Sequence, residues 1–137
     1  MERSLVIIKP DAVSRGLGGA VLSRLEGKGL RLAALKMLHL DKDLARRHYA
    51  IHRDKPFFSS LVTYITSEPV VVAVFEGEGV VARIREAAGA TDPANAGKGT
   101  IRGDYGLDIE KNTIHGSDSV ETAETEIGLF FTEDEIF

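Results

Sequence analysis

Short apolar segments along the whole chain alternate between the spacing of a β-strand and that of an α-helix, and this alternation constrains the fold more than any other feature. Leu5–Ile8 is an apolar run that Pro10 ends, and the β-branched run Val70–Phe75 is typical of a central strand. Residues 30–38 form a further extended run. No repeat, Ser/Pro-rich linker or block of like charge divides these segments, so we expect one domain over residues 1–137.

Segments with helical spacing separate these strands. An apolar face recurs through residues 17–25 and again through 57–65, and a further helix is expected at 80–88. Asp41 can cap a helix after the second strand. This order predicts an α+β fold, a ferredoxin-like split βαβ sandwich in which helices cover a four-stranded antiparallel sheet.

Residues 89–112 are rich in glycine and show no periodicity, so we expect an irregular loop. Loops longer than about 12–15 residues are usually functional or disordered. After this loop, Thr113–His115 is expected to be a short strand, and Asp118 with Glu121 resembles a capping box at the start of a last helix. The inner face of that helix would carry Val120, Ala123 and Ile127.

Composition excludes several classes of protein. The chain has no cysteine, which rules out disulfides and thiolate chemistry, and its net charge of -4 argues against an extended nucleic-acid surface. The apolar runs are far shorter than the roughly 20 residues that cross a bilayer. The start Met1-Glu2-Arg3 leads directly into a strand, unlike a secretory leader. We therefore expect a cytoplasmic protein that binds neither membranes nor nucleic acid stably.

His48 and His52 have the spacing of a zinc-binding pair on a helix. Tyr49 occupies the position of the glutamate that such a catalytic motif requires, and no third ligand is evident. We interpret the two residues as partly exposed helix histidines.

His115 lies among small and polar residues just before a predicted helix, whose free N–H groups favour nearby anions. Neutral imidazole is a competent nucleophile when one ring nitrogen is free and the other is held by an acceptor. Glu126 could hold it, directly or through Ser117. On this segment alone, a histidine that fills a turn is the more common case.

Basic side chains could converge on a polyphosphate, because guanidinium forks and ammonium groups suit that ligand. The candidates are Lys9, Arg85, Lys98, Arg102 and Lys111. For Lys98 and Lys111 we favour simple solvation at the surface.

Four motifs follow one another along the chain: Ile7-Ile8-Lys9-Pro10-Asp11-Ala12-Val13, Lys55-Pro56-Phe57-Phe58, Gly99-Thr100-Ile101-Arg102-Gly103-Asp104 and Asn112-Thr113-Ile114-His115-Gly116-Ser117-Asp118-Ser119. Together they resemble the nucleoside diphosphate kinase family, and the resemblance covers essentially the whole chain without gaps. It implies that His115 is the nucleophile, phosphorylated on its pros nitrogen, and that Glu126 and Ser117 orient it.

The resemblance also implies the nucleotide contacts. The residues expected to contact phosphates and ribose are Lys9, Tyr49, Arg85, Thr91, Arg102 and Asn112, of which Lys9 and Tyr49 join the catalytic set. Phe57 would stack on the base, with Leu61 and Ile109 lining its slot. Stacking accepts any base, so broad base specificity is expected.

The implied reaction is a double displacement. A nucleoside triphosphate such as ATP would transfer its γ-phosphoryl group to His115, and a diphosphate such as GDP would then accept it. Mg²⁺ would be carried by the nucleotide's own phosphates, so we expect no direct protein ligand and at most an outer-shell contact from Asp118.

The family assembles from a common dimer into hexamers or tetramers, and this sequence does not choose between them. The second extended run with its flanking helix is the expected dimer edge. Two positions depart from the family: Glu68 stands where glycine is usual and Phe130 where tryptophan is usual. We expect neither to contact the site, although Glu68 can alter its turn, because glycine often serves positions with positive φ.

Two other functions are compatible with parts of the sequence. A non-catalytic ferredoxin-like module, either a small-molecule sensor or an RNA-binding sheet, would explain the fold but not the cluster from Asn112 to Ser119. A family member acting as a protein-histidine phosphodonor or regulatory partner would use the same phosphohistidine.

Overall fold

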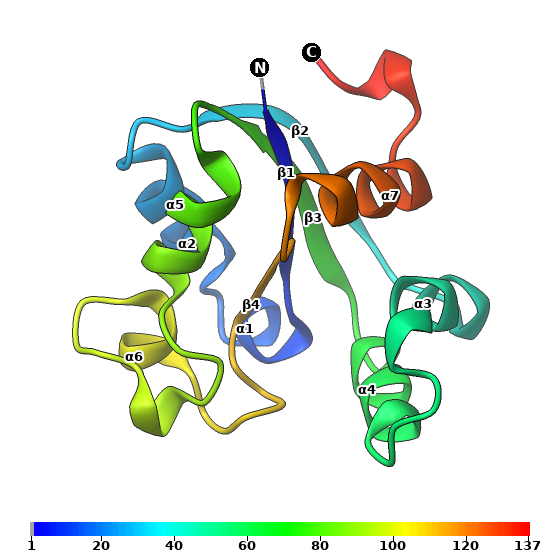
Figure 1. The fold of residues 1–137 in the computed structure, drawn as a ribbon. Coiled ribbons are helices and arrows are strands. Elements are labelled where there is room, and N and C mark those ends of the chain that lie inside the picture. Colours follow the sequence, from blue (N-terminus) through cyan, green and yellow to red (C-terminus); the bar gives the residue numbers. More distant parts are fainter. Residues whose placement is uncertain (1) are drawn as a thin grey trace.

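The sheet places the N-terminal strand at its centre. The computed structural model describes residues 2–137. The strands are β1 (Arg3–Ile8), β2 (Arg31–Leu38), β3 (Val70–Glu76) and β4 (Ile114–Gly116). They form one antiparallel sheet in the order β2-β3-β1-β4 (Figure 1), which confirms the predicted ferredoxin-like α+β fold.

Helices cover both faces of this sheet. They are α1 (Pro10–Ser14), α2 (Gly18–Glu26), α3 (Lys42–His48), α4 (Phe58–Ile65), α5 (Val80–Ala88), α6 (Ile101–Tyr105) and α7 (Val120–Phe130), with 3₁₀ turns η1 (Ala50–His52), η2 (Pro93–Asn95) and η3 (Glu133–Glu135). In Figure 1, α2 and α5 lie on one side of the strands, and α3, α4 and α7 lie on the other.

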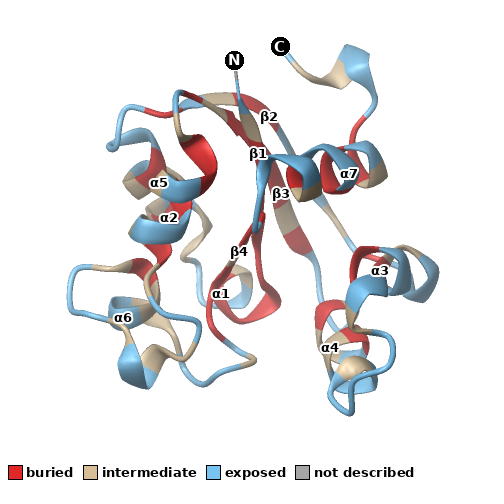
Figure 2. Cartoon of the chain, in the orientation of Figure 1, coloured by how far each residue is buried: buried red, intermediate tan, exposed pale blue. Residues whose placement is uncertain are grey.

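Period-two alternation in β1 divides the core between these two layers. Leu5 and Ile7 pack with the apolar residues of α3, α4 and α7, whereas Val6 and Ile8 pack with those of α2 and α5. All four side chains are fully buried, and Figure 2 shows buried residues along the central strands. A strand buried on both faces explains why its sequence is continuously apolar.

The helices expected at 17–25, 57–65 and 80–88 are present as α2, α4 and α5. Asp41 caps α3 as predicted, because its carboxylate accepts the Leu44 N–H at 2.7 Å. The sequence pattern missed α1, which begins directly at Pro10, a residue that suits the first helical position.

Two expectations near the C-terminal helix were wrong. Ser119, rather than Asp118, caps α7, since its side chain accepts the Thr122 N–H at 3.0 Å. Of the predicted inner face, Ala123 and Ile127 are buried but Val120 is 39% exposed. Val120 is the first residue of α7 and lies outside both clusters of core residues.

The segment 89–112 is more ordered than its composition indicates. It contains η2 and α6, and Thr100 caps α6 by accepting the Gly103 N–H at 3.0 Å. Gly103 lies so close to the carbonyl of Gly97 that any side chain there would clash. Of the helices in residues 2–137, none is long and apolar enough to span a membrane.

Candidate active site

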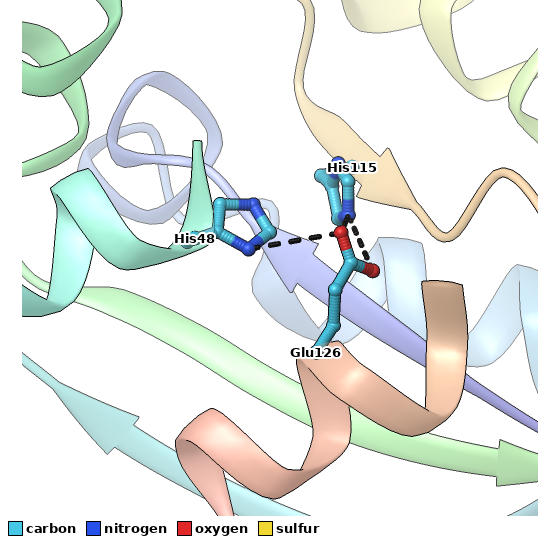
Figure 3. Close-up of side chains that lie close together, drawn as sticks. All are labelled: His48, His115 and Glu126. Atoms are coloured by element: carbon cyan, nitrogen blue, oxygen red, sulfur yellow. Dashed lines mark hydrogen bonds and ion pairs between the residues drawn. The ribbon is translucent and has the colours of Figure 1, made fainter. Parts of the chain in front are cut away.

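The register of the sheet decides where His115 points. In the β1–β4 pair, His115 lies opposite Ile7. Directly paired residues project from the same face, so His115 faces the layer formed by α3 and α7. Figure 3 shows the outcome: His48 from α3 and His115 from β4 both point toward the carboxylate of Glu126 on α7.

Glu126 selects the tautomer of His115. Nε2 of His115 lies 3.1 Å from each carboxylate oxygen, and Ser117 Oγ donates to Oε1 at 2.6 Å. Burial raises the pKa of Glu126, but the hydrogen bonds and charge of its neighbours outweigh this and leave it below its ordinary value. Because an ionised carboxylate can only accept, Nε2 must carry the ring proton, and the lone pair of neutral His115 is on Nδ1.

His48 is buried, which corrects the prediction of a partly exposed helix histidine. Its side chain is 1% exposed and its ring lies edge-on to that of His115, with centroids 4.7 Å apart. Burial lowers the pKa of His48 to about 3, so the ring is neutral. The ring of Phe130 also packs edge-on against that of His48, with centroids 5.6 Å apart. Phe130 is therefore one contact away from His115, and it is not among the residues that line the cavity described below.

Lys9 and Asn112 form a buried pair that belongs to the same site. Lys9 Nζ donates to Asn112 Oδ1 at 2.7 Å, and Asn112 Nδ2 donates to the Thr91 carbonyl at 2.8 Å. Burial, assisted by the nearby Arg102 charge, lowers the pKa of Lys9 to about 8. The ammonium therefore lacks a full counter-charge, which prepares it for an anionic ligand.

Two arginines lie around the same cavity. Arg102 donates to the carbonyls of Gly89 and Ile114 at 2.9 and 2.8 Å, and burial lowers its pKa to about 10. Arg85 is paired with Asp118 at 2.6 Å, with both side chains more than half exposed. Arg102 is thus fixed by the backbone, whereas Arg85 can exchange its partner for another anion.

Thr113 has an unusual backbone conformation. Its φ of 77° makes it the one non-glycine residue with positive φ in the part of the chain that the structure describes. Such a conformation is rare for a β-branched residue. Thr113 is fully buried and its carbonyl accepts the Lys9 N–H at 2.9 Å. Glu68, in contrast, avoids positive φ, so the loss of glycine there introduces no such strain.

One cavity of about 450 Å³ brings these groups together. Of the residues predicted from sequence, it is lined by Lys9, Tyr49, Phe57, Leu61, Arg85, Thr91, Arg102, Ile109, Asn112, His115, Asp118 and Glu126. Ser117 lies fully buried behind Glu126, and Lys98 and Lys111 are outside the lining. The remaining lining residues, which were not predicted as site residues, are His48, Ile51, His52, Glu110, Ile114 and Gly116. For His48 and His52, the only signal in the sequence was their spacing.

The cavity lining also includes four aromatic or aliphatic side chains, those of Tyr49, Phe57, Leu61 and Ile109. Phe57 is 45% exposed and Ile109 is 62% exposed, so both offer open surface to a ligand. Burial raises the pKa of Tyr49 above its ordinary value, so its hydroxyl stays protonated. The cavity lining thus combines basic groups and a histidine with apolar side chains, a combination that suits a phosphorylated molecule with a flat, apolar part.

Comparison with known proteins identifies one family. The family described as nucleoside diphosphate kinase matches residues 2–136. The nucleoside diphosphate kinase of Dehalococcoides mccartyi strain 195 is 59% identical over 99% of this chain and 96% of its own, and that of Archaeoglobus fulgidus is 57% identical over 99% and 90%.

Solved structures give the same result. The Aquifex aeolicus nucleoside diphosphate kinase has a TM-score of 0.98 and 43% identity, covering 99% of both chains. The Halobacterium salinarum enzyme, solved in complex with CDP, has a TM-score of 0.96 and 50% identity, covering 99% of this chain and 91% of that one. The chain therefore belongs to the nucleoside diphosphate kinase family and is a phosphotransferase.

Proposed function

We propose that His115 is the phosphorylated nucleophile of a double displacement between nucleotides. The observation that carries this proposal is the contact of Nε2 with both oxygens of Glu126, which leaves the Nδ1 lone pair free. That lone pair attacks the γ-phosphorus, the bond to the β-phosphate oxygen breaks, and the diphosphate departs. A second diphosphate reverses the step. The carboxylate of Glu126 stabilises the positive charge that develops on the ring.

Lys9, Arg85 and Arg102 supply the positive charge that this transfer requires. Lys9 and Arg102 are held by hydrogen bonds to neighbouring groups, so they meet the phosphates without reorganisation. Thr91 and Asn112 line the same cavity. Tyr49, protonated and buried, can donate a hydrogen bond to the ribose or phosphates.

The family's kinases work with a divalent metal ion, and we propose Mg²⁺ carried by the nucleotide. Mg²⁺ prefers octahedral oxygen ligands and keeps several waters. The one cluster of potential ligands within residues 2–137 contains two histidines, which suits Mg²⁺ poorly. Bound to the phosphates, the ion would neutralise charge on them. Asp118 lines the cavity, which supports the proposal that it contacts a water of the ion's outer shell.

The apolar side chains in the cavity lining support broad base specificity. Phe57 offers a face for stacking, and Leu61 and Ile109 form walls that donate or accept no hydrogen bond. Base identity therefore changes the binding free energy little.

The proposal is tested by incubating the protein with ATP labelled on its γ-phosphate and Mg²⁺, without acceptor. The label should become acid-labile and alkali-stable on the protein, and added GDP should remove it as GTP. His115→Ala should take up no label, whereas His39→Ala, which alters an exposed histidine, should behave like the parent. A folded parent protein that takes up no label contradicts the proposal.

We also infer that the chain is one cytoplasmic domain that dimerises through β2. This strand pairs with β3 along one edge, and its exposed face carries Leu35 and Met37, 48% and 63% exposed. Open apolar edge strands favour pairing with another chain. Met37→Lys should reduce the mass measured by light scattering. Whether such dimers build hexamers or tetramers would follow from the parent's mass in the same measurement.

A further inference from the structure

His48, His115 and Glu126 have the spacing of a metal site. One ligand atom from each residue lies within 4.8 Å of the other two. Nδ1 of His48 is 3.7 Å from Oε2 of Glu126, and Nε2 of His115 is 3.1 Å from the same oxygen (Figure 3). Ligands held about 2.0–2.1 Å from a tetrahedral zinc ion lie about 3.3 Å apart, so the two contacts with Glu126 are close to this spacing and His48 would move toward the ion on binding.

His48 provides the second observation. Its side chain is 1% exposed, and neither ring nitrogen has a hydrogen-bond partner among residues 2–137. Buried polar side chains in native proteins nearly always have one, so an unpartnered ring calls for an explanation. The phosphoryl transfer proposed above assigns no role to His48. A neutral imidazole offers one lone pair, which is what a metal ion binds.

The ligand types select the class of ion. Two imidazoles, one carboxylate and an open fourth position are the set found in several catalytic zinc sites. Imidazole favours Zn²⁺ and its transition-metal neighbours, whereas Mg²⁺ requires oxygen ligands. Ser117 Oγ, which donates to Oε1 of Glu126 at 2.6 Å, would orient the carboxylate from behind. The chain contains no cysteine that could compete for the ion.

We propose that His48, His115 and Glu126 bind one divalent transition-metal ion such as Zn²⁺, and that this ion and the phosphoryl group exclude each other at His115. The ion forms a bond to Nε2, the N–H bond there breaks, and the proton moves through solvent to Nδ1. No electron is transferred. The neutral ring then has no lone pair on Nδ1 with which to attack phosphorus. Zinc would thus hold the enzyme in an inactive form.

Metal binding is measured on nucleotide-free, unphosphorylated protein by equilibrium dialysis with Zn²⁺. Co²⁺ serves as a spectroscopic probe of tetrahedral coordination. We expect one Zn²⁺ per chain, at least a tenfold loss of affinity in His48→Phe and in Glu126→Gln, and no change in the surface control His39→Ala. Circular dichroism shows which variants fold. The Zn²⁺ affinity of either variant that folds is enough to test the proposal. Absence of saturable binding below millimolar Zn²⁺, or binding unchanged in a folded variant, overturns the proposal.

The exclusion rests on the proposed function, whereas metal binding does not, so the two can fail separately. Protein labelled from γ-labelled ATP and freed of nucleotide should bind Zn²⁺ at least tenfold more weakly than unlabelled protein. Coupling between two ligands is reciprocal, so Zn²⁺ should also suppress labelling, and a chelator should restore it. Equal affinity in the labelled and unlabelled forms overturns the exclusion. Failure of the parent to take up label, with zinc binding intact, contradicts only the proposed phosphohistidine.

Discussion

Nε2 of His115 lies 3.1 Å from both carboxylate oxygens of Glu126, so one side chain sets both the orientation and the tautomer of the imidazole. Replacing Glu126 with glutamine keeps the shape but allows an amide N–H to face the ring, which favours a lone pair on the wrong nitrogen. We expect kcat to fall by about 10²–10⁴-fold, as for other lost acid–base partners, with a smaller change in KM. Steady-state kinetics test this, and a loss below tenfold would contradict a role for Glu126 in selecting the tautomer.

Ser117 links the site to the central strand. Its hydroxyl accepts the Leu5 N–H at 3.1 Å and donates to Glu126, all within the core. Ser117→Ala leaves the buried Leu5 N–H without that acceptor, which should lower the free energy of unfolding by about 1–3 kcal/mol. Urea unfolding measures the change. The exposed Ser14→Ala is the control and should stay within about 0.5 kcal/mol of the parent.

Deprotonation of Lys9 should lower the activity of the enzyme at alkaline pH. Its pKa of about 8 lies below the ordinary 10.5, so the free enzyme loses this positive charge as pH rises through 8. We expect kcat/KM, which reports the free enzyme, to fall about tenfold per pH unit above 8. In Lys9→Arg, which keeps the charge, kcat/KM should not fall above pH 8. In Lys111→Gln, which alters a residue outside the cavity, the fall should remain.

The same shift predicts the pH dependence of stability. The unfolded chain binds the Lys9 proton up to about pH 10.5, whereas the folded chain releases it near pH 8. Protonated Lys9 therefore opposes folding below pH 8, and this penalty is relieved between pH 8 and 10.5. Relative to Lys9→Met, the ligand-free parent should become more stable across that window. A constant difference between the two unfolding free energies would show that the lysine titrates normally.

Replacing Phe57 should weaken the binding of nucleotides with different bases by a similar factor. Stacking contributes about 1–3 kcal/mol per base, so Phe57→Ala should raise KM by about 5- to 150-fold. The factor should be nearly equal for ATP, GTP and CTP. Phe137→Ala removes another exposed phenylalanine, outside the cavity, and should leave KM unchanged. A loss confined to one base would mean that a polar group reads that base.

Asp118 forms an exposed ion pair with Arg85, and such pairs contribute less than about 1 kcal/mol to stability. Asp118→Asn should therefore leave the melting temperature almost unchanged. If Asp118 contacts the hydration shell of Mg²⁺, the concentration of Mg²⁺ for half-maximal activity should rise several-fold. An unchanged magnesium dependence would restrict Asp118 to holding Arg85 in the free enzyme.

Local spacing was sufficient to predict much of the fold. The buried runs of β1 and β3 were recognisable because strands covered on both faces are continuously apolar. The cap at Asp41 depends on a neighbour only three residues away. The cap of α7 was assigned one residue too early, because Asp118 and Ser119 are both good capping residues and only the backbone geometry separates them.

The sequence by itself determined the alternation of strands and helices, the family, and the set of residues expected at the site. Only the tertiary structure decided that His48 is buried against His115, that Thr113 has positive φ, and that the pKa of Lys9 is low. Each of these depends on groups distant in sequence, such as Lys9 and Asn112, which are 103 positions apart. Sheet register and helix packing bring such groups together, and desolvation then changes their chemistry in ways that local spacing does not encode.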